Sequence, residues 1–305
     1  MTSTTTPVTT GAQVPAPNTR PERAPRRRRQ GARAVRHHLL MLVLVCIVLY
    51  PGVWMFLSAF KPSNQIIGEI NPLPSEVTFA NFASALAGIG GVSFWTFVWN
   101  SLLLAVLSVV GVILSCAFAA FAFARIEFPG KKVFFAIMIG TLLLPVHVVI
   151  IPQYIVFNNM GLVNTFVPLL APKFLATEAF FVFLLVQFMR GLPFELDEAA
   201  KLDGAGYWRT FWSVILPLTR PALITSSIFA FIWSWNDFFG PLLYLKRPNL
   251  YTLPIALRQY VDQTTTSDYG AQMAMAVLAL VPVMLFFLVF QRYIVEGVAT
   301  QGLKG

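Results

Sequence analysis

Six apolar runs, each long enough to cross a lipid bilayer as a helix, constrain this chain more than any other feature of its sequence. They cover residues 39–60, 94–124, 133–157, 169–189, 221–245 and 271–291. A hydrocarbon core about 30 Å thick needs roughly 20 apolar residues per helix. Backbone groups in lipid must be paired internally, and the runs lack the alternation of barrel strands, so they predict helices. The expected fold is an all-α polytopic membrane protein with six transmembrane helices.

The net charge of +9 raises the alternative of a nucleic-acid partner, but the distribution of basic residues argues against it. Eight of the 22 Lys and Arg residues precede the first run, and most of the others flank later runs. Anionic lipid headgroups explain this placement, at about 1 kcal/mol per basic side chain near the surface. A chain with 57% hydrophobic and 11% charged residues is also unlike a soluble domain. We therefore expect membrane lipid as a partner and no nucleic acid.

Charge asymmetry sets the expected orientation. Seventeen Lys and Arg residues fall in segments on the same side as the N-terminus, and five fall on the other side. By the positive-inside rule, both termini should be cytoplasmic. We expect a disordered basic tail over residues 1–38, a transmembrane domain over 39–291 with a cytoplasmic loop at 191–220, and a cytoplasmic tail over 292–305.

Within that loop, a polar stretch over residues 195–221 separates the fourth and fifth apolar runs. Pro193 suits a first helical turn, and the acidic residues that follow it complement the positive end of a helix dipole. Small residues on one face, with Glu198 beside them, suit close contact with another protein surface. A plain amphipathic hairpin at the membrane interface remains an alternative. Asp203 and Gly204 should end this short helix.

Patterns typical of catalytic chemistry are absent from the sequence. Gly130-Lys131 lacks the remainder of a Walker A loop, and neither HExxH nor GxSxG occurs. The three histidines are not spaced as a metal cluster. We therefore expect this chain to bind no metal or cofactor and to be non-catalytic, with any fuel consumed by another subunit.

The polar stretch resembles the EAA signature of the membrane-spanning subunits of bacterial ATP-binding-cassette importers. Glu198-Ala199-Ala200 is followed after three residues by Gly204, and nine residues later by Val214-Ile215-Leu216-Pro217. Val214 stands where isoleucine is usual. The resemblance implies a type I importer fold, in which this stretch is a coupling helix seated in a groove of the ATPase. Transferred to this chain, it gives Glu198 a polar contact, Ala199 and Ala200 the close approach, and Gly204 the bend.

Further segments across residues 39–305 resemble carbohydrate-uptake permeases, specifically the shorter permease of the maltose-type pair. They are Asn100-Ser101, residues 121–130, Trp235-Asn236-Asp237, residues 251–254, 291–297 and 302–305. This resemblance implies a sugar substrate in a bacterial cell membrane. It also implies a heterodimer with a second homologous permease, a cytoplasmic ATPase dimer that holds ATP and Mg, and an extracytoplasmic sugar-binding protein.

Four residues are candidates for the translocation path: Trp233, Asn236, Asp237 and Glu178. Trp233 and Asp237 are four residues apart, so they share a helix face on which a ring and a carboxylate would suit a sugar. Asn236 and Asp237 alternatively cap a kink just beyond them, which we favour. Glu178 alternatively snorkels toward the outer surface beside Lys173.

Two other functions stay open from the residues. One is an importer permease for a solute other than a sugar. The other is a self-sufficient secondary transporter, which should show repeated halves and coupling acids at mid-membrane, and neither is evident in the sequence.

Overall fold

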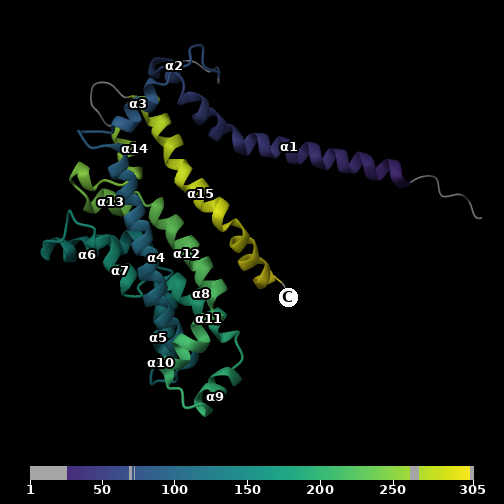
Figure 1. Ribbon diagram of the computed structural model, residues 1–305, viewed down its shortest axis with the longest axis vertical. Coiled ribbons are helices and arrows are strands. Elements are labelled where there is room, and N and C mark those ends of the chain that lie inside the picture. The colour runs from purple at the N-terminus through teal and green to yellow at the C-terminus, as the bar shows by residue number, and fades with distance from the viewer. Residues whose placement is uncertain (1–25, 69–70, 72, 262–267, 303–305) are drawn as a thin grey trace, which may run out of the picture. The chain divides into compact units, whose positions relative to one another are not determined.

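The computed structural model describes residues 26–68, 71, 73–261 and 268–302 (Figure 1). Those residues form helices with no β-sheet, apart from one isolated bridge between Ile89 and Val92. The elements are α1 (Arg26–Ser58), α2 (Ser63–Gly68), α3 (Ala80–Ala87), α4 (Phe94–Arg125), α5 (Lys131–Thr141), α6 (Val146–Asn159), α7 (Val167–Phe174), α8 (Ala179–Arg190), α9 (Glu195–Leu202), α10 (Tyr207–Thr210), the π-helix η1 (Phe211–Ile215), α11 (Leu216–Leu218), α12 (Arg220–Trp235), α13 (Phe239–Tyr244), the 3₁₀-helix η2 (Pro248–Leu250), α14 (Leu253–Gln259) and α15 (Tyr269–Gly302).

Internal contacts divide the chain into two units, Met1–Pro51 and Gly52–Gly305, at a proline inside α1. The described part of the first unit is helical from Arg26. The disordered tail expected over residues 1–38 therefore differs from the structure at 26–38, and residues 1–25 lie outside the described part. At the other end, α15 continues through residues 292–302 of the expected C-terminal tail.

In the second unit, α4 is the central helix and packs against α12, α8 and α7. It runs from the end of the unit that holds α3 and α14 toward the end that holds α9 and α10 (Figure 1). Small residues allow this contact. Ala105, Ala117 and Ala120 are fully buried, and a Cβ added to Gly111 would lie 2.8 Å from the Phe174 ring. The small residues of α4 therefore allow neighbouring helices to approach it closely.

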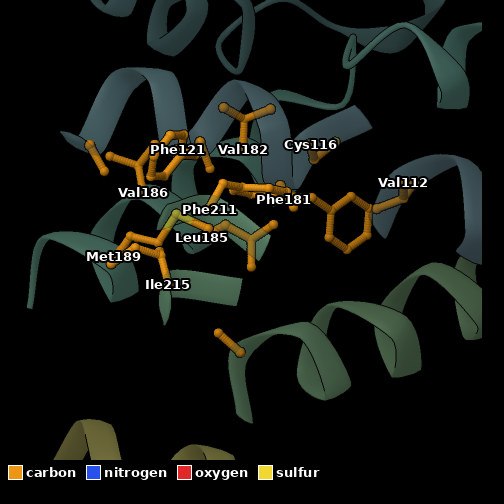
Figure 2. Close-up of a cluster of buried hydrophobic side chains, with 14 of the residues drawn as sticks. Val112, Cys116, Phe121, Phe181, Val182, Leu185, Val186, Met189, Phe211 and Ile215 are labelled. Atoms are coloured by element: carbon orange, nitrogen blue, oxygen red, sulfur yellow. The ribbon is translucent and has the colours of Figure 1, made fainter. Parts of the chain in front are cut away.

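A buried apolar cluster joins α4, α8 and η1 near the α9 end of the unit (Figure 2). Leu185 and Met189 of α8 pack there with Phe211 and Ile215 of η1, and all four side chains are at most 2% exposed. Burying side chains of this size stabilises the native state by about 1.5 to 3 kcal/mol each. The segment that follows α9 is therefore anchored to the bundle.

The helical membrane fold agrees with the sequence prediction, but the described residues hold four or five candidate spans instead of the six expected. Four described helical segments are long and apolar enough to cross a membrane: Val35–Ser58, Phe94–Arg125, Val167–Arg190 and Tyr269–Gln291. A fifth is counted if Tyr207–Leu218 and Arg220–Trp235, bent by 76°, form one span. The third predicted run is divided into α5 and α6, each shorter than a span. Pro145 adopts an extended conformation at this break, and it has no N–H to continue a helix.

Candidate functional site

The loop between α8 and α12 contains a short helix, α9, whose start and end follow from its sequence. Three acidic residues occupy its first turn, where carboxylates complement the helix dipole. After the helix, Gly204 takes a φ of +74°, which glycine adopts without a steric cost. The N–H of Ala205 then donates to the carbonyl oxygen of Ala200 at 2.9 Å, closing the last turn.

The exposed face of α9 combines Glu198, Ala199 and Leu202. Leu202 is 89% exposed, although leucine normally lies inside a protein. Ala200, in contrast, is buried within this chain at 7% exposure. Of the two signature alanines, only Ala199 is therefore open to a partner in this structure. The sequence pattern had grouped both on one contact face and had not singled out Leu202.

Arg125, the last residue of α4, is buried beneath this loop with its side chain 1% exposed. Its Nη1 donates to Asp197 Oδ2 at 2.9 Å, and its Nη2 donates to the carbonyl oxygens of Met189 at 2.6 Å and Leu192 at 2.9 Å. The guanidinium carbon also lies 4.5 Å from the centre of the Phe194 ring. Sequence reasoning missed this cluster. The available signal was a basic residue ending an apolar run, which needs a nearby acid when buried.

The second half of the loop forms an elbow before α12. Helices Tyr207–Leu218 and Arg220–Trp235 meet at 76°, and the signature residues Leu216 and Pro217 lie just before the bend. Trp208 stays 67% exposed and stacks on Phe118 of α4, with ring centroids 5.4 Å apart. The elbow is therefore held to α4 both by buried apolar packing and by this aromatic pair.

Of the four candidate path residues, two line a common cavity, and Asn236 and Glu178 do not. Trp233 and Asp237 line one cavity of about 200 Å³, together with Lys173 and Ser234. Glu178 forms an ion pair with Lys173 and does not line that cavity.

Two polar side chains near this cavity act as helix caps, while Ser108 and Ser234, which line it, bond each other at 3.1 Å. The side-chain amide of Asn236 donates to the carbonyl oxygen of Ile232 at 2.9 Å, at the end of α12. Asp237 Oδ1 accepts the N–H of Gly240 at 3.1 Å, at the start of α13. Both side chains thus satisfy backbone groups exposed by the break between two helices. Among the described residues, no cluster of three or more His, Cys, Asp and Glu side chains could hold a metal ion.

Comparison with known proteins identifies the family of this chain. Residues 111–300 match the family described as binding-protein-dependent transport system inner membrane component. The chain belongs to this family. The match covers α9, the elbow and the path candidates, so the site described above lies within the shared region of these permeases.

Two curated relatives and one solved structure resemble this permease. The diacetylchitobiose uptake system permease protein NgcG of Streptomyces coelicolor is 36% identical over 88% of both chains. The sn-glycerol-3-phosphate transport system permease protein UgpE of Brucella abortus is 33% identical over 85% of this chain and 94% of its own. A crystal structure of a bacterial ABC transporter involved in the import of the acidic polysaccharide alginate includes a chain with a TM-score of 0.76 and 22% identity. The match covers 87% of this chain and 98% of that one. At that identity, the likeness supports the fold alone.

Proposed function

We propose that this chain is a membrane-spanning subunit of an ATP-driven importer and that α9 docks on a separate ATPase subunit. The exposed face of α9 supports this assignment, because Glu198 offers a carboxylate, Ala199 permits close approach and Leu202 offers an apolar anchor. In this proposal the chain is non-catalytic, and the partner ATPase holds ATP and Mg. The loop at residues 191–220 is then the coupling loop, and it lies on the cytoplasmic side.

We propose a carbohydrate as the solute, delivered by an extracytoplasmic binding protein and passed between this chain and a second, homologous permease. A relative named for diacetylchitobiose uptake, 36% identical, supports this class. Trp233, which lines the 200 Å³ cavity, offers a ring on which a sugar face can stack. Asn236 and Asp237 act in this proposal as helix caps, because their described hydrogen bonds go to backbone groups.

Transport then follows from a two-state equilibrium. Closure of the ATPase subunits around ATP draws the coupling helices of the two permeases together, and the bundles rotate to open the path outward. The loaded binding protein favours the same state from the other side of the membrane. Nucleotide and solute therefore bias one equilibrium from opposite faces.

Reconstitution of the whole importer in proteoliposomes tests this function. Uptake of radiolabelled diacetylchitobiose should require all partners and hydrolysable ATP. Arms with sn-glycerol-3-phosphate test a solute other than a sugar. Uptake by this chain alone, without the ATPase, would contradict the proposal and identify a secondary transporter.

A further inference from the structure

Arg125 joins three elements at one point: the end of α4, the end of α8 and the first turn of α9. Its acceptors, Met189, Leu192 and Asp197, lie 64, 67 and 72 residues away in the sequence. We infer that Arg125 is a positioning residue that fixes the coupling helix to α4 and α8, so that a movement of α9 moves both helices. This inference rests on the proposed docking of α9 on an ATPase.

The chemistry of the contact requires an arginine. A planar guanidinium directs several donors at fixed angles, so it can bond a carboxylate and two carbonyl oxygens together, whereas an ammonium acts as a compact point charge. The carbonyl of Met189 lies in the last turn of α8, where a positive charge is favourable, and it also accepts the N–H of Leu192 at 3.2 Å. The ring of Phe194 covers the guanidinium carbon at 4.5 Å.

Burial makes each partner of this pair depend on the other. The Arg125 side chain is 1% exposed and that of Asp197 is 13% exposed, although both residues line a cavity of about 310 Å³. Removal of one partner therefore leaves a largely buried charge without its counter-ion. Among the described residues, no second ion pair ties α9 to another helix. This pair is therefore the ionic part of the contact between α9 and the bundle, beside the apolar packing of Ala200.

The chain offers a matched control two residues from Arg125. Lys131 pairs with Glu127 at 2.8 Å, a length similar to that of the buried pair, but Glu127 is 90% exposed. Lys131 holds the pKa of that carboxyl below its usual value through a hydrogen bond and its charge. Exposed pairs of this kind contribute little to stability. Loss of a carboxylate charge can therefore be compared at a buried and an exposed site.

The experiment uses the complete importer, reconstituted with the variants Asp197→Asn, Arg125→Lys, Asp197→Glu and the control Glu127→Gln. Each complex is assayed for ATPase subunit retained on purification, basal ATP hydrolysis, and hydrolysis stimulated by binding protein loaded with diacetylchitobiose. Asp197→Asn and Arg125→Lys should retain the ATPase subunit and basal hydrolysis within twofold, but lose at least tenfold in stimulation. Asp197→Glu, which restores the carboxylate, should recover most of the stimulation, and Glu127→Gln should match the unaltered importer.

A second readout does not depend on the solute. Hydrogen exchange at residues 94–101, the far end of α4, is compared with and without ATP, Mg and vanadate. The nucleotide should change exchange there in the unaltered complex and in Glu127→Gln, and the change should disappear in Asp197→Asn.

Two results would overturn the inference. The first is normal stimulation together with normal exchange in Asp197→Asn. The second is loss of the ATPase subunit from the Asp197→Asn complex, which would show that the pair serves folding alone. Failure of the unaltered importer to take up any solute with ATP counts against the proposed function instead, and the exchange comparison still decides the role of Arg125.

Discussion

Two glycines of the loop at residues 191–220, Gly204 and Gly206, differ in the sign of the backbone angle φ. A Cβ added to either meets no atom within 4 Å, but φ is +74° at Gly204 and −75° at Gly206. Gly204→Ala should cost about 1 kcal/mol through left-handed strain, whereas Gly206→Ala should carry no such strain. Limited proteolysis of the loop and uptake rates check this. Equal behaviour of the two variants would show that the left-handed turn is unimportant.

Leu202 gives the sharpest test of docking, because it is 89% exposed and its removal should leave the fold intact. Leu202→Ser should weaken ATPase binding roughly tenfold to a hundredfold, since burying a leucine stabilises a contact by about 1.5 to 3 kcal/mol. Titration of the purified ATPase against the permease in nanodiscs measures the change. The thermal unfolding midpoint of the isolated permease should stay the same. Unchanged affinity would mean that another face of the loop makes the contact.

Replacement of Asp237 and replacement of Trp233 should affect transport differently. Asp237→Asn keeps an oxygen that can accept the N–H of Gly240, so the start of α13 and the choice of solute should be preserved. Trp233→Ala removes the ring that lines the cavity, and the KM for solute should rise severalfold with little change in ATPase binding. Competition between sugars in uptake assays measures both. A new solute preference in Asp237→Asn would assign the carboxylate to the path.

At the scale of helices, the sequence predicted the structure best where local residues alone determine the ends of a helix. The acidic turn before Ala199 and the glycine at 204 indicated a short helix, and α9 spans Glu195–Leu202. The third apolar run was predicted as one span, yet it forms α5 and α6. A hydropathy profile averages over the residues around Pro145 and so does not detect the break there. The break arises because Pro145 is extended and has no N–H to continue a helix.

The contact of α4 with α7 depends on Gly111. A Cβ there would lie 2.8 Å from the Phe174 ring and 3.1 Å from the backbone of Lys173. Gly111→Ala should therefore destabilise the permease by about 1 to 3 kcal/mol through overpacking. Gly140 of α5 is the matched control, because an added Cβ meets nothing within 4 Å and alanine favours helix. Thermal unfolding in detergent should show a lower midpoint for the first variant only. A common shift in both would remove the packing explanation.

At the scale of the whole molecule, the class of fold could be predicted but the site could be predicted only in part. Apolar runs determine helices because lipid leaves the backbone no other partner. The signature spacing located α9, but it could not show that Ala200 is buried and Leu202 exposed, because these depend on how the loop returns to the bundle. The pairing of Arg125 with Asp197 joins residues 72 apart, and no local pattern specifies it.

The small size of α9 has a pharmacological consequence. It has eight residues, and isolated helices shorter than about 12 residues are marginal in water. A linear peptide copied from residues 195–202 would therefore be a poor competitor for the proposed ATPase groove, since most of its molecules would be unfolded. A stapled version, in which a covalent link replaces the constraint that Arg125 and the glycine turn impose on the folded chain, is the better starting point for an inhibitor of solute import.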